Sequence, residues 1–279
     1  MRTVFLGTST FAAAVLARLA ESAHRPALVV TRPDAPKGRG RAVSPPPVAE
    51  TARALGLEVD QPSSVNGDGA RARIDAAQPD VVVVCAFGAL IKEPLLSEHE
   101  MLNVHPSLLP RWRGAAPVER AIMAGDEETG VSIMRVTAGL DSGPVSLAGA
   151  EPIARDDTYG SLAPRLQELG ATLLIRALDE RPPFVEQDET RVTYADKIGP
   201  QDRTLDLDRP AIFNERIVRA LHPHIGARLE LRDGTFLGVH AARARDDGLL
   251  ELLEVQPPGR RPMAYADYLR GHVPVPGVA

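Results

Sequence analysis

The sequence predicts an α/β fold with a parallel sheet, followed by a smaller β-rich unit. In the first half of the chain, short apolar runs bounded by turn-forming residues alternate with segments whose apolar residues recur at helical spacing. Strands connected through helices form parallel sheets, because a parallel pair needs a crossover connection. Towards the carboxyl terminus, strand-like runs follow one another without such helices. We therefore expect a Rossmann-like layer first and a β-rich unit second.

Each element of the first part has a local pattern that predicts it. Strands are expected at residues 2–7, 27–31, 80–86, 101–105, 131–136 and 144–148, and helices at residues 11–20, 46–55, 70–77 and 162–178. Thr10 is the expected N-cap of the first helix, because a hydroxyl at that position can accept a hydrogen bond from the first turn. Arg181, Pro182 and Pro183 end the long helix, since proline cannot continue it.

A polar stretch at residues 187–203 predicts an extended linker between two domains. The first domain then covers residues 1–186 and the second covers residues 204–279. In the second domain we expect a helix at residues 210–221, strands at residues 227–231, 236–242 and 249–255, and a closing helix at residues 263–270.

Composition limits the classes of protein and of site. The 279 residues are 44% hydrophobic, which is ample for a buried core, and the net charge of −5 confines any nucleic-acid contact to a local basic surface. No apolar run reaches the roughly 20 residues that cross a bilayer, so we expect a cytoplasmic protein without membrane contact. The single cysteine, Cys85, lies in an apolar run and is expected to pack in the core. The seven histidines show no metal-binding spacing, so we expect no metal.

Three polar residues are expected to converge on one point. Asn103 and His105 alternate across Val104 at the carboxyl end of a predicted strand, so their side chains point the same way. The loop that follows, residues 106–110, is stiffened by a proline at each end. Asp141 lies between two glycines, where the backbone can bend sharply to present its carboxylate.

These residue types suit acyl transfer by direct attack. An amide and an imidazole can donate hydrogen bonds to the oxyanion of a tetrahedral intermediate, and a carboxylate can accept a proton from an attacking amine. A single histidine at the end of a strand is more often structural. The combination of Asn103, the stiffened loop and Asp141 favours catalysis for His105.

The segment from Asn103 to Pro117 reads NVHPSLLPRWRGAAP and resembles the signature of the methionyl-tRNA formyltransferase family. Similar stretches recur along most of the chain, at residues 5–9, 31–34, 38–40, 61–62, 125–126, 128–131 and 193–197. The resemblance implies a Rossmann-like formyltransferase domain followed by an OB-like domain. It also implies transfer of a formyl group from 10-formyltetrahydrofolate to the amino group of methionyl initiator tRNA, in translation initiation, by a protein that we expect to be a monomer.

The resemblance implies roles for particular residues. The catalytic residues would be Asn103, His105 and Asp141. The folate-binding residues would be Ser107, Leu108, Leu109, Pro110, Phe87 and Gly88. The tRNA-binding residues would be Lys37, Arg39, Arg41, Arg111 and Arg113. Composition alone favours a solvated loop without a partner at residues 32–41, and an ion pair with Asp126 or Glu119 is the alternative for Arg111 and Arg113.

The chain departs from the family pattern at three places. Pro106 stands where glycine is common, and Phe87 stands where tyrosine is frequent. The second domain is shorter by about twenty residues, with the gap near residues 242–248, and only three of the five strands of an OB fold are visible. We therefore expect a shortened OB-like domain.

Three other functions remain as alternatives. The first is the same reaction on an amino sugar nucleotide, which the short second domain suggests. The second is a non-catalytic tRNA-binding or folate-binding protein. The third is an NAD-dependent oxidoreductase, but Gly7 to Ala12 lacks the glycine fingerprint of a dinucleotide site.

Overall fold

The computed structural model describes residues 1–37 and 42–279, without the side chain of Lys37. Arg39 and Arg41, both predicted to bind tRNA, lie outside the described residues. The chain forms two compact units. The first unit consists of residues Met1–Arg113, Gly130–Glu151 and Pro164–Thr193, and the second of residues Gly114–Thr129, Pro152–Ala163 and Tyr194–Ala279. The predicted domain limits at residues 186 and 204 stay a prediction.

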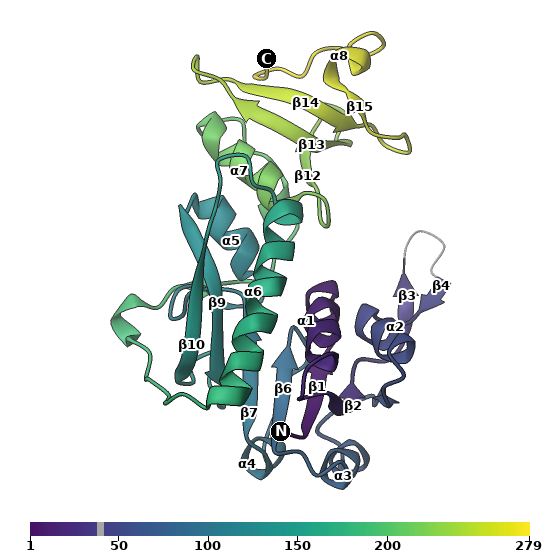
Figure 1. The fold of residues 1–279 in the computed structure, drawn as a ribbon. Helices are drawn as coiled ribbons and strands as arrows, with labels where there is room; N and C mark the ends of the chain where they lie inside the picture. The colour runs from purple at the N-terminus through teal and green to yellow at the C-terminus, as the bar shows by residue number, and fades with distance from the viewer. Residues whose placement is uncertain (38–41) are drawn as a thin grey trace. The chain divides into compact units, whose positions relative to one another are not determined.

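A seven-stranded sheet forms the centre of the first unit (Figure 1). Its strand order is β10-β9-β7-β6-β1-β2-β5. The strands are β1 (Thr3–Gly7), β2 (Pro26–Val30), β5 (Val59–Asp60), β6 (Val81–Cys85), β7 (Met101–His105), β9 (Glu128–Arg135) and β10 (Val145–Pro152). The predicted parallel sheet is confirmed for β5, β2, β1, β6 and β7, whereas β9 runs antiparallel to β7.

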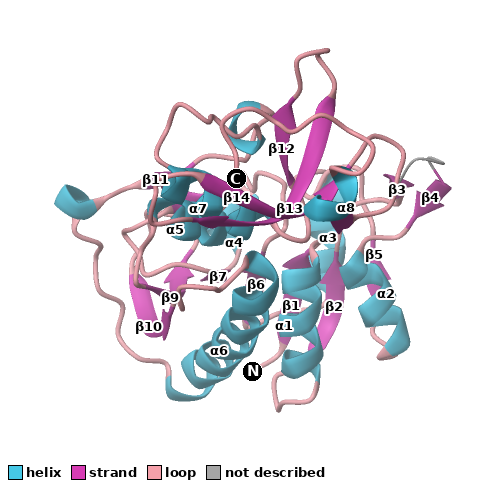
Figure 2. Cartoon of the chain, turned by 90° about the horizontal axis from the view of Figure 1, so that it is seen from above, coloured by secondary structure: helices cyan, strands magenta, loops and turns pink. Residues whose placement is uncertain are grey.

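Helices cover both faces of this sheet. The helices are α1 (Thr10–Ala20), α2 (Pro47–Ala54), α3 (Asp68–Ala76), α4 (Leu95–Glu98) and α6 (Tyr159–Glu180). Figures 1 and 2 show α1 and α6 side by side along one face, where Arg18 of α1 pairs with Glu168 of α6 at 3.1 Å. Ile74 of α3 packs in the core on the other face, with Val4, Leu6 and Val82.

The N-cap of α1 differs from the prediction by one residue. Ser9, not Thr10, is the cap: its backbone is extended and its hydroxyl accepts a hydrogen bond from the Ala12 N–H at 3.3 Å. Both residues carry a hydroxyl, so side-chain chemistry alone does not separate them. Thr10 already belongs to the helix.

The second unit contains the predicted β-rich part of the chain. Its four-stranded antiparallel sheet has the order β12-β13-β14-β15. These strands are β12 (Ala227–Glu230), β13 (Phe236–Ala244), β14 (Leu250–Gln256) and β15 (Met263–Ala264), and the helices are α5 (Pro117–Ala124), α7 (Ala211–Leu221) and α8 (Tyr265–Tyr268). Leu221 of α7 packs with Leu229, Leu237 and Leu252 in one core.

Two predictions for this unit are corrected. The segment predicted as a closing helix begins with strand β15, and α8 covers only its middle. The sheet therefore has one strand more than the three expected. The predicted gap in the chain falls on the β13–β14 hairpin, where Arg245 N–H donates to the Leu249 carbonyl at 2.9 Å.

The remaining elements are short. They are β3 (Ala35–Lys37), β4 (Ala42–Ser44), β8 (Arg113–Gly114), β11 (Tyr194–Ala195), η1 (Glu189–Arg191) and η2 (Gln201–Arg203). The predicted linker, residues 187–203, thus contains two 3-10 turns and one strand. Within residues 1–37 and 42–279, no helix is long and apolar enough to span a membrane.

Candidate active site

The three predicted catalytic side chains converge in the first unit. Asn103 and His105 lie on the same side of β7, at its carboxyl end. The amide Nδ2 of Asn103 donates to Oδ1 of Asp141 at 3.5 Å, and Nδ1 of His105 lies 3.6 Å from Oδ2 of Asp141. The imidazole is buried and the carboxylate is partly exposed. The arrangement places an amide, an imidazole and a carboxylate at one point that solvent can reach.

The backbone of Trp112 determines which nitrogen of His105 is free to react. His105 Nε2 lies 2.9 Å from the Trp112 carbonyl oxygen. A carbonyl can only accept, so Nε2 carries a proton, and the other nitrogen, Nδ1, faces Asp141. In the neutral imidazole Nδ1 then has a lone pair directed at the carboxylate.

The turn that carries Asp141 needs glycine at its end. Asp141 has a φ of +44°, in the left-handed region. A Cβ atom at Gly143 would lie 1.9 Å from the carbonyl oxygen of Arg135, so no other residue fits without a backbone shift. The sharp bend expected from the flanking glycines is therefore present, and it depends most on Gly143.

Three residues brace this turn from outside, and we call them the Arg113 brace: Arg113, Gln187 and Glu189. The Gln187 amide donates to the carbonyls of Asp141 and Gly143 at 2.8 and 2.7 Å. Arg113 Nε donates to Gln187 Oε1 at 3.0 Å, and its other nitrogens donate to Glu189 at 2.7 and 3.2 Å. The hydrogen bonds from Arg113 hold the pKa of Glu189 below its usual range.

The geometry of Arg113 does not fit the predicted tRNA contact. Its side chain is only 3% exposed, and its guanidinium is occupied by the brace. A phosphate cannot reach a buried guanidinium that is already engaged on both edges. Sequence reasoning missed Gln187 and Glu189 because they begin a polar stretch with no local signal for a distant partner.

The predicted folate loop, residues 107–110, is internally rigid. The buried Ser107 hydroxyl donates to the Arg111 carbonyl at 2.6 Å. The Ser132 hydroxyl donates to the Ser107 carbonyl at 2.7 Å and accepts from the Leu109 N–H at 3.1 Å. Because Ser107 is turned inward, Leu108, Leu109 and Pro110 form the half-exposed side of the loop.

The other residues that are predicted to contact folate or tRNA lie in different surroundings. Phe87 is buried in the core, and its carbonyl accepts from the Thr8 hydroxyl at 2.7 Å. Gly88 follows with a φ of +72°, a conformation that glycine adopts readily. The guanidinium of Arg111 lies 4.4 Å from the centre of the Trp112 ring, a stacking contact. Whether these residues contact folate or tRNA stays a prediction.

Cys85 is not a nucleophile. It is fully buried at the end of β6, opposite Gly7 of β1. Burial raises the pKa of its thiol, which keeps the thiol protonated and unreactive. The sequence-based prediction of a packed core residue is confirmed.

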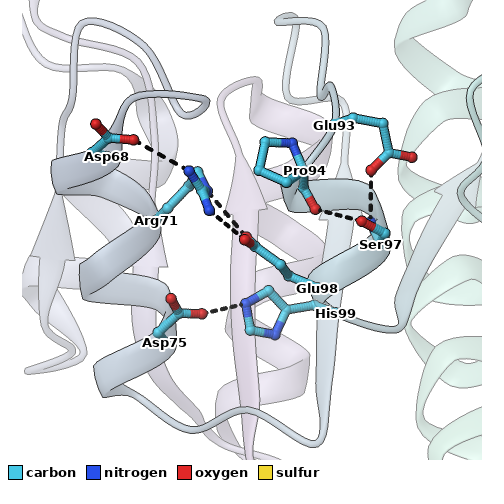
Figure 3. Close-up of polar contacts among 8 residues, drawn as sticks. All are labelled: Asp68, Arg71, Asp75, Glu93, Pro94, Ser97, Glu98 and His99. Atoms are coloured by element: carbon cyan, nitrogen blue, oxygen red, sulfur yellow. Dashed lines mark hydrogen bonds and ion pairs between the residues drawn. The ribbon is translucent and has the colours of Figure 1, made fainter.

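One group of side chains in the described part of the chain is close enough to suggest a metal site, and it is better explained by ion pairs. Ligand atoms of Asp75, Glu98 and His99 lie within 4.8 Å of one another. Figure 3 shows that Arg71 pairs with Glu98 and that His99 Nε2 contacts Asp75, at 2.8 Å. The hydrogen bonds from Arg71 lower the pKa of Glu98. A carboxylate already paired with arginine is a poor metal ligand, so we assign no metal here.

Comparisons with known proteins identify the family. A family model described as formyl transferase matches residues 1–178. A methionyl-tRNA formyltransferase from Methylococcus capsulatus is 42% identical over 300 residues, covering 98% of this chain and 97% of the relative. The chain belongs to the methionyl-tRNA formyltransferase family. A second member, from Halorhodospira halophila, is 42% identical and covers 99% of this chain and 98% of the relative.

Solved structures support the fold independently. A methionyl-tRNA formyltransferase from Clostridium thermocellum has a TM-score of 0.64 at 13% identity, covering 92% of this chain and 98% of that one. A 4-N formyltransferase from Francisella tularensis has a TM-score of 0.66 at 14% identity, covering 85% of this chain and 96% of that one. At these identities the likeness concerns the fold alone. The fold class expected from the sequence is confirmed, and the chain is a formyltransferase rather than an NAD-dependent oxidoreductase.

Proposed function

We propose that this protein transfers the formyl group of 10-formyltetrahydrofolate to the amino group of methionyl initiator tRNA. The observation that carries the proposal is the convergence of Asn103, His105 and Asp141 at the end of β7. It occurs in a chain that matches methionyl-tRNA formyltransferases over nearly their full length. Initiator tRNA and the folate are then its substrates, and the cytoplasm, where translation initiates, is the location that we infer.

The reaction needs an oxyanion site and a proton path. The methionyl amine attacks the formyl carbon, a new C–N bond forms, and the bond from that carbon to the folate nitrogen breaks. Asn103 Nδ2 donates to the developing oxyanion. Since Nε2 of His105 is engaged by the Trp112 carbonyl, Nδ1 is the nitrogen that faces the reacting group.

Asp141 accepts the proton that the amine loses. After the amine attacks, its nitrogen is cationic in the tetrahedral intermediate and must shed a proton, and the departing tetrahydrofolate nitrogen must gain one. The Asp141 carboxylate beside His105 can accept the first proton and then pass it to the departing nitrogen, so that no proton is gained or lost overall. The residues that would hold the folate are Leu108, Leu109 and Pro110 on the rigid loop, with Phe87 and Gly88 on the neighbouring loop after β6.

The decisive experiment measures formyl transfer from 10-formyltetrahydrofolate to charged initiator tRNA. Charged elongator methionyl-tRNA and an amino sugar nucleotide are run alongside it. We expect efficient transfer to the initiator and little to the other two acceptors. Transfer to the amino sugar nucleotide alone would replace the proposed acceptor, and binding of folate and tRNA without transfer to any acceptor would make the protein a binding protein.

A further inference from the structure

Thr193 contacts the loop that contains Trp112 through three hydrogen bonds. Its hydroxyl accepts from the Trp112 N–H at 2.9 Å, and its carbonyl accepts from the Arg113 N–H at 2.9 Å. Its own N–H donates to the Pro110 carbonyl at 3.3 Å. Thr193 belongs to the predicted linker, residues 187–203, and lies 81 positions after Trp112. A residue that is distant along the chain therefore fixes the backbone of this loop.

These bonds fix both peptide groups that flank Trp112. The Trp112 N–H belongs to the peptide group on its amino side, and the Thr193 hydroxyl accepts from it. The Arg113 N–H belongs to the peptide group on the carboxyl side, and the Thr193 carbonyl accepts from it. This second peptide bond is trans, so its N–H and its C=O point in opposite directions. The Trp112 carbonyl is thus turned away from Thr193, and it lies 2.9 Å from Nε2 of His105.

The backbone of Trp112 needs such support. Its φ is +64°, in the left-handed region, which a bulky side chain rarely adopts. A conformation of this kind persists only where the surrounding structure determines it. On the amino side, the Ser107 hydroxyl adds a bond to the Arg111 carbonyl at 2.6 Å. Thr193 contacts the peptide groups on both sides, so loss of its hydroxyl should loosen the Trp112 backbone and the direction of its carbonyl.

Two acceptors compete for the ring proton of neutral His105. The Trp112 carbonyl oxygen lies 2.9 Å from Nε2, and Oδ2 of Asp141 lies 3.6 Å from Nδ1. A neutral imidazole has one N–H, so only one of its nitrogens donates. The shorter contact places the proton on Nε2. If the Trp112 carbonyl turned away, the carboxylate would be the stronger acceptor and the proton would move to Nδ1.

The position of this proton matters for Asp141. With the proton on Nδ1, the imidazole would donate to the Asp141 carboxylate and occupy the group that accepts the proton of the amine. With the proton on Nε2, the carboxylate stays available for that proton. The orientation of the Trp112 carbonyl therefore affects the chemical step.

We propose that Thr193 is a positioning residue that keeps the proton of neutral His105 on Nε2. It acts through the Trp112 carbonyl, which it orients by holding both flanking peptide groups. The kinetic part of the proposal rests on the proposed function, because it gives His105 and Asp141 their roles in formyl transfer. The position of the proton is a property of the protein without substrates and is measured separately.

The test compares Thr193→Val with Thr193→Ser. Valine keeps the shape of threonine and removes the hydroxyl, whereas serine keeps the hydroxyl. The ring nitrogens of His105 are observed by ¹⁵N NMR at a pH at which the imidazole is neutral, and its signals are those missing in His105→Asn. We expect the proton on Nε2 in the wild type and in Thr193→Ser. In Thr193→Val the ratio of the two tautomers should shift about fivefold towards Nδ1–H, the effect of losing one hydrogen bond.

Steady-state kinetics test the consequence for the reaction. In Thr193→Val, kcat for formyl transfer should fall about tenfold, and both KM values should change by less than about twofold. Thr193→Ser should stay within about twofold of the wild-type kcat. Thr235→Val is the matched control, because it removes an exposed hydroxyl that donates to Asp233 at 2.7 Å in the second unit. It should leave the tautomer and kcat unchanged.

The proposal is wrong if the wild type has the proton on Nδ1, or if Thr193→Val leaves the tautomer unchanged. A change of tautomer without a fall in kcat, or a rise in a KM value with kcat unchanged, also overturns it. Unchanged NMR signals from the other histidines show that Thr193→Val is folded. If that variant does not fold, Thr193→Ala takes its place with the same expected results.

Failure of the proposed function is a separate result. If the wild-type protein formylates no acceptor, the tautomer comparison alone decides the role of Thr193. A shift towards Nδ1–H in Thr193→Val then supports the positioning of His105 without the proposed reaction. An unchanged tautomer removes that role.

Discussion

At the scale of single residues, the chemistry of the candidate site depends on which side-chain atoms already form hydrogen bonds within the protein. The Trp112 carbonyl oxygen accepts a hydrogen bond from Nε2 of His105. Nδ1 is therefore the nitrogen that remains for the reacting group. Asp141 stands beside both Nδ1 and the Asn103 amide. Its carboxylate is thus the one group that contacts the two others. Substitution of Asp141 should therefore affect chemistry more than binding.

Asp141→Asn keeps the size of the side chain and removes its charge. We expect kcat to fall by a factor of about 100 or more, because the amine loses its proton acceptor. The affinity for the folate should stay within about threefold, since folate binding does not require that proton transfer. Steady-state kinetics and a folate titration measure both quantities. The control is Asp68→Asn on α3, which lies at the exposed Arg71 ion pair. Near-normal turnover of Asp141→Asn would remove Asp141 from the mechanism.

Among the elements, the Arg113 brace is the feature with the clearest effect on the site. It joins the start of the predicted linker to the turn between β9 and β10 through the Gln187 amide. The turn carries Asp141 in a left-handed conformation. Without the brace, two carbonyls of the turn lose their donor and the carboxylate loses a fixed position.

Gln187→Ala tests the brace. We expect kcat to fall about tenfold with little change in the KM values, because a misplaced carboxylate slows the chemical step and leaves ground-state binding intact. Gln187→Glu should be more damaging than Gln187→Ala, since a carboxylate would face the carbonyl oxygens of Asp141 and Gly143. Steady-state kinetics of both variants measure kcat and the KM values, and unfolding curves check that the variants remain stable. If the KM values rise and kcat is unchanged, the brace has no role in positioning Asp141.

The ion pair between Arg120 and Asp202 predicts how the stability of the second unit depends on pH. Burial by itself raises the pKa of Asp202, but hydrogen bonds from Arg120 at 2.9 Å and from the Gly199 N–H at 2.8 Å outweigh it and lower the pKa. A carboxyl whose folded pKa is lowered stabilises the fold above its unfolded pKa, about 3.9. That stabilisation is lost as the pH falls through the lowered folded value.

Asp202→Asn should therefore lower the free energy of unfolding at pH 7 by about 1–2 kcal/mol. The difference from the wild type should shrink when the pH falls below about 4, because the wild-type carboxyl is then protonated as well. Urea unfolding of both proteins at pH 7 and at several acidic values provides the comparison. A difference that stays constant with pH would mean that the charge of Asp202 does not contribute.

For the whole molecule, the two compact units have separate hydrophobic cores. Val4, Leu6 and Val82 belong to the core of the first unit. Leu237 and Leu252 belong to the core of the second. The candidate catalytic residues all belong to the first unit. Damage to the second core should therefore leave the folding of the catalytic residues largely intact.

Leu237→Ala tests this separation. The side chain is fully buried, so its truncation should destabilise the second unit by about 2–5 kcal/mol. Hydrogen exchange should accelerate for amides of β12, β13 and β14 and change little for amides of β1 and β6. Leu19→Ala, in α1 of the first unit, is the reciprocal control, because Leu19 is also fully buried. Equal acceleration in both units of the Leu237 variant would show that they unfold together.

The sequence by itself determined the features that depend on neighbours along the chain. The apolar run Val81–Cys85 predicts a buried strand, and the alternation of Asn103 and His105 places both on one side of β7, as the structure confirms. A continuous motif of fifteen residues, Asn103 to Pro117, indicates the family to which the comparisons assign the chain. Local patterns of this kind persist because side-chain direction and turn chemistry follow from the backbone period.

Only the tertiary structure decided the pairings between distant residues. Arg113 and Gln187 are 74 positions apart, and no local pattern predicts that the guanidinium is buried against the amide rather than exposed to tRNA. Charged residues look alike in a sequence, whether they pair inside the protein or remain available to a ligand. The difference arises only when the chain folds, because tertiary packing determines which partners each charge can reach.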